Sequence, residues 1–261
     1  MRTATGEADA MSHGPQITLP WLDPEHPEAP FPDPAQALRE PNGLLAAGGD
    51  LSVPRLLNAY RSGVFPWFEA GQPILWWSPD PRAVLEPSRF RLHRSLKKAI
   101  RNRGYTVSFD RAFEAVIDAC AGPRDYADGT WITTSMQRAY IALHRTGHAH
   151  SVEVWDGPRL IGGLYGVAVG RLFCGESMFS RERDASKIAL AWLCRHLVAW
   201  GWPLVDVQME TEHLLNLGAE AIPRGEFIAR IREIAQEPVE PGPWRTDPTL
   251  SPLDKGWHSQ T

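Results

Sequence analysis

Cysteine and long apolar runs are scarce in this sequence, and each scarcity excludes a class of protein. The three cysteines are an odd number without the spacing of a zinc site, which argues against a disulfide framework. No apolar run approaches the roughly 18–20 residues of a membrane span, and the first residues lack the apolar stretch of a secretory signal. We expect a reduced, cytoplasmic protein with no membrane segment.

An overall basic excess is also missing, since the formal net charge is −4. The charge is unevenly distributed, however. Residues 82–103 contain eight Lys or Arg and one acid, a local net charge of +7. Such a segment could neutralise several phosphates of an RNA backbone, or it could be a solvated helix face. Its candidate phosphate contacts are Arg94, Lys97, Lys98 and Arg101.

Proline marks the two ends of the chain, with eight of its 23 copies in residues 1–42 and five in residues 237–261. This composition predicts a disordered tail over residues 1–30 and an extended or disordered tail over residues 238–261. Between them we expect a small N-terminal α/β domain over residues 31–82 and a larger domain over residues 83–237.

The larger domain should be α/β with a mixed sheet. Helical and strand patterns alternate in an order that suggests an antiparallel meander followed by a strand–helix–strand unit. This order is typical of the N-acetyltransferase (GNAT) type of sheet. The helical patterns cover residues 95–102, 111–121, 135–146, 184–201, 213–217 and 225–235, and the strands cover 105–109, 150–155, 159–169, 171–180 and 203–209.

Residues 171–209 hold the polar side chains that are best placed for chemistry. Glu176 lies among apolar neighbours, and Asp206 and Gln208 share one face of the last strand. A strand–helix–strand unit of this length is usually parallel with adjacent strands, so the three side chains could meet in one cleft. In the alternative interpretation, Glu176 is an edge residue and Asp206 a polar group at a strand end.

Three tryptophans, Trp67, Trp76 and Trp77, lie close together near the end of the small domain. They predict either a small aromatic core or an exposed platform on which a nucleotide base could stack. The composition favours a core.

Other functions fit parts of the sequence. Acetyl transfer from acetyl-CoA would suit the fold, but the loop over residues 180–186 has no glycine to cradle a pyrophosphate. A cysteine hydrolase would use Cys174 with His148 or His150, although nothing marks a stabilised thiolate. A metal site at His148, His150 and His213 has no evident geometry. A non-catalytic RNA-binding module would leave Glu176, Asp206 and Gln208 without a role.

Several motifs, in order, resemble the leucyl/phenylalanyl-tRNA–protein transferase family. They include GGDLS at residues 48–52, GVFPWF at 63–68, GTWIT at 129–133, FCGESMFS at 173–180 and DVQ at 206–208. The resemblance extends over about residues 31–231. It implies an enzyme that moves Leu, Phe or Met from aminoacyl-tRNA to proteins beginning with Arg or Lys, which marks them for N-degron degradation. It also implies a monomer that needs no metal or other cofactor.

The resemblance assigns roles to individual residues. Trp67 and Trp131 would flank the terminal adenosine of the tRNA, Phe173 would lie near the reacting centre, and Tyr60 would contact substrate. The donor side chain would enter a pocket whose wall contains Leu193 where the family can have Phe, which puts the preference between Leu and Phe in question. The other predicted pocket residues are Leu164, Met178, Leu190 and Val205.

The acids are assigned by the chemistry of the acceptor. Its α-amine lies beside a cationic side chain, so the site must offer negative charge without trapping the amine as ammonium. We expect Asp206 and Gln208 to orient the amine and relay its proton, and Glu176 to hold the basic first residue.

Overall fold

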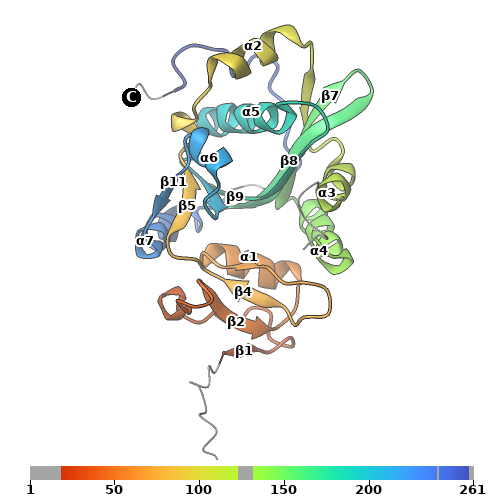
Figure 1. The fold of residues 1–261 in the computed structure, drawn as a ribbon. Coiled ribbons are helices and arrows are strands. Elements are labelled where there is room, and N and C mark those ends of the chain that lie inside the picture. The colour runs from red at the N-terminus through yellow and green to blue at the C-terminus, as the bar shows by residue number, and fades with distance from the viewer. Residues whose placement is uncertain (1–18, 123–131, 240, 259–261) are drawn as a thin grey trace, which may run out of the picture.

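The computed structural model describes residues 19–122, 132–239 and 241–258, which form a four-stranded and a seven-stranded sheet (Figure 1). The small sheet lies at the bottom of Figure 1, and α1 separates it from the large sheet. The hydroxyl of Ser52 caps α1 and Pro54 lies in its first turn, so the helix begins where these residues favour it. In spatial order the small sheet comprises β1 (Trp21–Leu22), β2 (Leu44–Gly48), β4 (Leu75–Trp77) and β3 (Phe65–Pro66), accompanied by η1 (Pro34–Gln36) and α1 (Val53–Arg61).

The start of the described chain belongs to this small sheet. β1 pairs with β2 in parallel, and the fully buried Arg55 donates hydrogen bonds of 2.7 Å to the carbonyls of Asp23 and His26. The prediction of a tail through residue 30 is therefore wrong for residues 19–30. Proline content could not show that a distant arginine anchors this segment.

The large sheet confirms the predicted order of elements. β6 to β9 form an antiparallel meander, and β9, α5 (Ala185–Ala199) and β10 form a parallel strand–helix–strand unit, as in N-acetyltransferase-type domains. β5 returns antiparallel to β10 and pairs with the short β11. In spatial order the strands are β11 (Glu220–Ile222), β5 (Arg82–Leu85), β10 (Leu204–Gln208), β9 (Leu172–Ser180), β8 (Arg159–Val169), β7 (Ala149–Asp156) and β6 (Thr106–Phe109).

Helices cover both faces of the large sheet and divide the core in two. α5 packs on one face with α2 outside it, whereas α1, α3, α4 and α7 pack against the other (Figure 1). Successive residues of a strand belong to the cores on opposite faces of the sheet. Leu204 lies in the core that contains residues of α1 and α7, and Val205 lies in the core that contains residues of α5. The helices are α2 (Arg94–Asn102), α3 (Phe113–Ala121), α4 (Thr134–Arg145), α5 (Ala185–Ala199), α6 (Glu212–Asn216) and α7 (Arg224–Ile234), with η2 (Pro87–Arg89) before α2.

A glycine of β8 allows the close packing that positions Phe173. A Cβ atom at Gly166 would lie 2.3 Å from the carbonyl oxygen of Cys174 and 2.6 Å from the Phe173 ring. The ring therefore lies directly over the strand, and its own exposed fraction is 1%.

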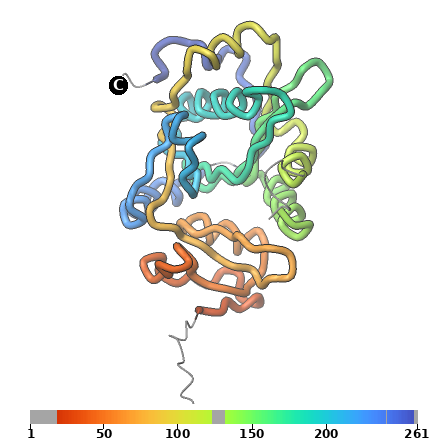
Figure 2. The backbone as a smooth tube through the Cα atoms, in the orientation of Figure 1, coloured from red at the N-terminus to blue at the C-terminus, as the bar shows by residue number. Residues whose placement is uncertain are grey.

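The C-terminal segment, residues 241–258, forms no helix or strand but packs on the large domain, where it lies near α2 and α5 (Figure 2). The Trp244 ring stacks on His150 with centroids 3.9 Å apart, and its main-chain N–H donates to the carboxylate of Asp110. The Trp257 side chain is also buried. The tail predicted to be extended or disordered is thus, over residues 241–258, an extended segment held by aromatic contacts.

The three cysteines are buried and form no disulfide with one another: Cys120 lies in α3, Cys174 in β9 and Cys194 in α5. Among the helices that the structure describes, none is both long and apolar enough to cross a bilayer.

Candidate active site

Glu176 and Gln208 meet at the edge shared by two parallel strands. β9 and β10 are neighbours in register, with Asp206 opposite Cys174. The Gln208 side-chain Nε2 donates a 2.9 Å hydrogen bond to Glu176 Oε1. The parallel strand–helix–strand unit expected from the sequence therefore brings these side chains together.

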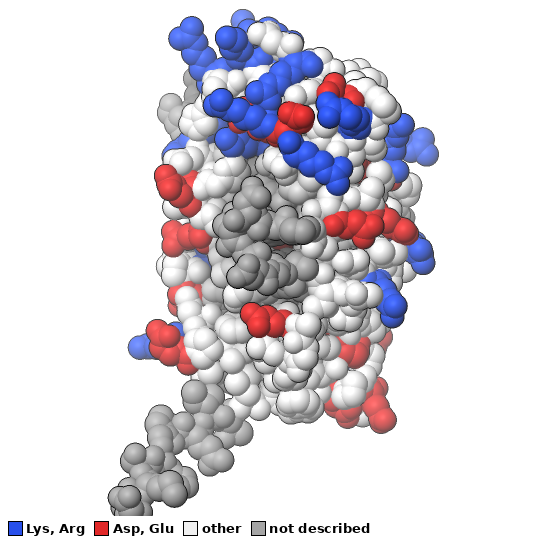
Figure 3. Space-filling model, turned by 45° about the vertical axis from the view of Figure 1, so that its right-hand side comes forward, with Lys and Arg blue, Asp and Glu red and all other residues white. Residues whose placement is uncertain are grey.

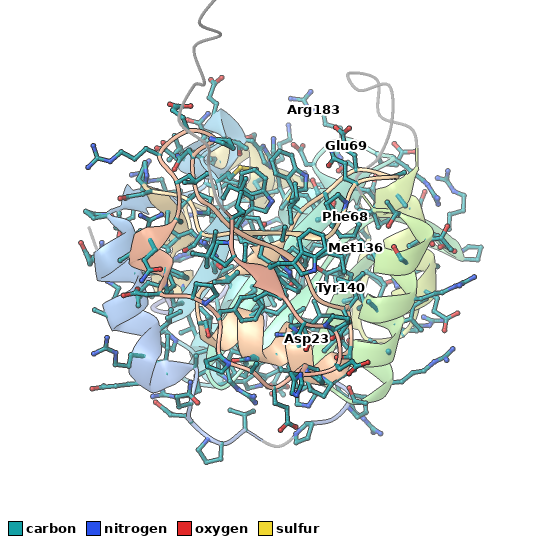
Figure 4. All side chains as sticks on the ribbon, turned by 90° about the horizontal axis from the view of Figure 1, so that it is seen from below. Asp23, Phe68, Glu69, Met136, Tyr140 and Arg183 are labelled. Carbon is teal, nitrogen blue, oxygen red and sulfur yellow. The ribbon has the colours of Figure 1, made fainter. Side chains whose placement is uncertain are left out.

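The other carboxylate oxygen of Glu176 belongs to a chain of phenols. Tyr140, on α4, donates a 2.6 Å hydrogen bond to Glu176 Oε2, and its hydroxyl lies 2.6 Å from that of Tyr60 on α1. Tyr140 points from α4 toward the centre of the molecule (Figure 4). Burial, together with the nearby Glu176 carboxylate, raises the pKa values of both tyrosines, so they remain hydrogen-bond donors.

Burial raises the pKa of Glu176 from 4.5 to about 7. Hydrogen bonds from the tyrosines and Gln208 favour the charged carboxylate and offset part of the effect, whereas the negative charge of Asp206 adds to it. Glu176 can consequently exchange a proton near neutral pH.

Asp206 lies behind this centre and is held by Arg82. The guanidinium donates two hydrogen bonds, Nε to Oδ1 at 2.8 Å and Nη2 to Oδ2 at 2.7 Å, and both side chains are almost completely buried. Asp206 Oδ1 also accepts the main-chain N–H of Gln208 at 3.0 Å. Unlike Glu176 and Gln208, Asp206 does not line the cleft described next.

An apolar cleft of about 1200 Å³ opens beside Glu176 and Gln208. Its walls come from β8, β9, β10, α3, α5 and α6. A cavity of this kind, with a few convergent polar groups, is the usual form of a small-molecule or side-chain binding site. All five apolar pocket residues predicted from the resemblance line it: Leu164, Met178, Leu190, Leu193 and Val205. Phe173, predicted to lie near the reacting centre, lines it as well.

Two other predicted substrate contacts lie outside the cleft lining. Tyr60 has an exposed fraction of 1%, and its hydroxyl lies beside that of Tyr140, next to Glu176. Trp67 is 40% exposed, and its ring lies edge-on to Trp77 with centroids 5.6 Å apart. Trp76 is fully buried, so the aromatic cluster contains both a core residue and an exposed one. Trp131 lies outside the described residues.

The predicted phosphate contacts form an exposed basic surface on α2. The side chains of Arg94, Lys97, Lys98 and Arg101 are all exposed. Lys and Arg gather at the top of Figure 3, the end of the molecule where Figure 1 shows α2.

The geometry does not favour the cysteine hydrolase hypothesis. Cys174 is fully buried, and burial beside Asp206 raises the pKa of its thiol, which disfavours the nucleophilic thiolate. His150 is instead bound to Asp110, with Nδ1 2.7 Å from Oδ2, and stacked on Trp244.

Sequence reasoning missed two residues of this site, Tyr140 and Arg82. Tyr140 falls on the apolar face of a predicted helix, which marks it as core and gives no sign of its hydroxyl bond. Arg82 is the first residue of the basic run, and the charge pattern alone does not separate it from the exposed members of that run. An arginine that begins a strand of buried residues was a signal that it needs a buried partner.

The mixed α/β sheet carries an apolar cleft that ends at a carboxylate–amide pair, which is the usual form of a binding or catalytic site for an apolar group. Residues 84–232 match the family model described as leucyl/phenylalanyl-tRNA protein transferase, and residues 49–80 match that of its N-terminal domain. The chain belongs to the leucyl/phenylalanyl-tRNA–protein transferase family.

Relatives with that name resemble the chain over most of its length. The enzyme of Pseudomonas fluorescens is 59% identical over 226 residues, which cover 87% of this chain and 99% of the relative. That of Xanthomonas axonopodis pv. citri is 57% identical and covers 87% of this chain and 91% of its own. That of Methylococcus capsulatus is 54% identical, with shares of 88% and 98%.

We expect Glu176 to make folding stability depend on pH. Its folded-state pKa of about 7 lies above the ordinary value of 4.5, so folding retains a proton that the unfolded chain loses. This contribution is complete below about pH 4.5 and is lost as pH rises toward 7. As pH rises from about 5 to 7.5, the free energy of unfolding measured with urea should fall in the wild type. The fall should be about 1–3 kcal/mol smaller in Glu176→Gln, which has no carboxylate to ionise at this position. The control is Glu114→Gln, at an exposed residue of α3. Equal pH dependence of stability in all three proteins would show that folded Glu176 is already ionised over this range.

Proposed function

We propose that this protein transfers Leu, Phe or Met from aminoacyl-tRNA to the α-amine of proteins that begin with Arg or Lys. The observation that carries the proposal is the apolar cleft ending at Glu176 and Gln208. It can hold an apolar aminoacyl side chain with the ester directed at a polar centre. We further propose that the protein acts as a cytoplasmic monomer and that the transfer marks its acceptors for N-degron degradation.

The cleft wall suits several unbranched or γ-branched donors. Met178 is flexible and can adapt to different side chains. The Leu193 side chain is smaller and more flexible than a Phe ring, so it leaves more room for the donor side chain in the cleft. We therefore propose that Leu, Phe and Met all enter, and that Leu193 influences the preference between Leu and Phe.

The reaction needs placement more than strong base catalysis. The donor ester is already activated, and an α-amine with a pKa of about 7.7–8.0 is partly neutral at cytoplasmic pH. Holding the amine against the ester and stabilising the developing charge can supply most of the acceleration. We propose that Gln208 orients the amine and that Glu176, when charged, holds the cationic first side chain.

The leading alternative, acetyl transfer from acetyl-CoA, would place phosphates at the N-terminus of α5. There the main-chain N–H of Ser186 is already bonded to the hydroxyl of Ser180 at 2.8 Å. Arg181 also donates from its side chain to the carbonyl of Leu160. These internal bonds occupy groups that a pyrophosphate would require.

A label-transfer assay separates these functions. We expect labelled leucine to move from charged tRNA to a peptide beginning with Arg, and not to the same peptide with an acetylated N-terminus. Transfer from labelled acetyl-CoA, with none from Leu-tRNA, would support the acetyltransferase. Tight tRNA binding without transfer to any acceptor would indicate the RNA-binding module.

We expect the basic face of α2 to bind the tRNA backbone. Reversing Lys97 and Lys98 to Glu should raise KM for Leu-tRNA and reduce its salt dependence, because fewer counterions are released on binding. The control reverses Arg138 and Arg145, two exposed residues of α4, and makes the same change in net charge. Equal effects of the two pairs would indicate a general charge effect instead of a contact at α2.

We expect Glu176 to discriminate acceptors by charge. Two peptides that differ only in beginning with Arg or with neutral citrulline have α-amines that titrate alike, so the ratio of their KM values isolates the side chain. In the wild type the preference for Arg should grow as pH rises through about 7, where Glu176 becomes charged. In Glu176→Gln the ratio should be small and independent of pH. A pH-dependent ratio that survives the substitution would assign the contact to another group.

A further inference from the structure

Arg82 is a buried cation whose guanidinium is hydrogen-bonded to Asp206 and to the Gly63 carbonyl and lies over two aromatic rings. Two of its nitrogens engage both carboxylate oxygens of Asp206, and Nη1 donates a 3.1 Å hydrogen bond to the carbonyl of Gly63. Its guanidinium carbon lies 4.9 Å from the Phe65 ring centroid and 4.6 Å from that of Phe227. The planar group is thus fixed by hydrogen bonds at its edge and by aromatic rings.

Asp206, held in this way, binds the backbone two residues further along the chain. The backbone of Gln208 has φ 66°, a left-handed conformation that is uncommon for residues other than glycine. The register of β10 against β5 shifts between Asp206 and Gln208. The Gln208 N–H bonds to Asp206 Oδ1, which ties this irregular backbone to a carboxylate that Arg82 keeps in place.

The departure from strand geometry directs Gln208 into the site. Its side-chain amide lines the cleft and donates to Glu176, whereas Asp206 stays behind the strand with both oxygens engaged. Both oxygens of Asp206 are bonded to Arg82 and the residue does not line the cleft, so its carboxylate does not face a substrate amine there. Its effect on the cleft passes through the position of Gln208.

We infer that Arg82 is a positioning residue that acts through Asp206 to hold Gln208 in its active orientation. The inference rests on the proposed function for what Gln208 does, and on the geometry alone for what holds it. Through Gly63 and Phe65, the same guanidinium ties the small sheet to β10. Trp67, the exposed indole directly after β3, is thereby held in a fixed relation to the reacting centre.

The test uses Arg82→Lys, which keeps the charge but cannot supply the bidentate bond and the Gly63 bond together. We expect kcat for transfer from Leu-tRNA to an Arg-initiated peptide to fall by about 10- to 150-fold, as for loss of a charge-assisted hydrogen bond. The KM values of both substrates should change less than about twofold. The control is Arg55→Lys, because Arg55 is also fully buried and its hydrogen bonds go to carbonyls of the turn after β1, not to β10. It should lower the melting temperature and leave kcat near the wild-type value.

A double-mutant cycle distinguishes positioning from a general loss of structure. If Arg82 acts through Gln208, then Arg82→Lys should cost little further kcat in a Gln208→Ala background. Losses that multiply would overturn the inference, as would an unchanged kcat in Arg82→Lys.

Hydrogen exchange provides a measurement that does not need activity. In Arg82→Lys the amide of Gln208 should exchange faster than in the wild type, whereas in Arg55→Lys it should not. Unchanged protection would refute the inference even if the wild-type protein transferred no amino acid. A wild type without transfer, combined with faster exchange in Arg82→Lys, would refute the proposed function alone.

Discussion

The buried pair of Arg82 and Asp206 is the interaction on which the arrangement of the site depends. Desolvating two charges is costly, and the bidentate geometry, the Gly63 carbonyl and the aromatic rings offset that cost. Such a pair contributes little net stability compared with apolar residues of similar size, but either partner left alone is strongly destabilising. Its value here is geometric, because it holds the carboxylate that binds the main-chain N–H of Gln208 at the end of β10.

The apolar walls of the cleft have two opposing effects on the charges inside it. Apolar walls exclude water and strengthen every electrostatic interaction inside, which favours stabilisation of a developing oxyanion. The same exclusion makes a carboxylate expensive, and this is the physical cause of the raised pKa of Glu176. Tyr140 and Gln208 moderate the cost by donating to its two oxygens, so the group can change protonation state near neutral pH without leaving the cleft.

Much of this arrangement could be predicted from the sequence. The apolar spacing over residues 184–201 and the alternation over 203–209 determine a strand–helix–strand unit, and its usual parallel pairing brings Glu176 beside Gln208. The pocket residues came from the resemblance instead. The partner of Arg82 could not be predicted, because the two residues lie 124 positions apart and β5 pairs with β10 only after a long excursion of the chain. The Tyr140 bond to Glu176, across 36 positions, depends in the same way on how α4 packs on the sheet.

The burial of all three thiols has a practical consequence. Cys120, Cys174 and Cys194 lie in α3, β9 and α5, which places one reporter against each face of the large sheet and one within it. A thiol reagent can react only when the surrounding element opens, because the thiolate must first reach water. The rates of modification of the three sites therefore record local opening separately from global unfolding. The native sequence contains its own probes of which wall of the cleft moves when a substrate enters.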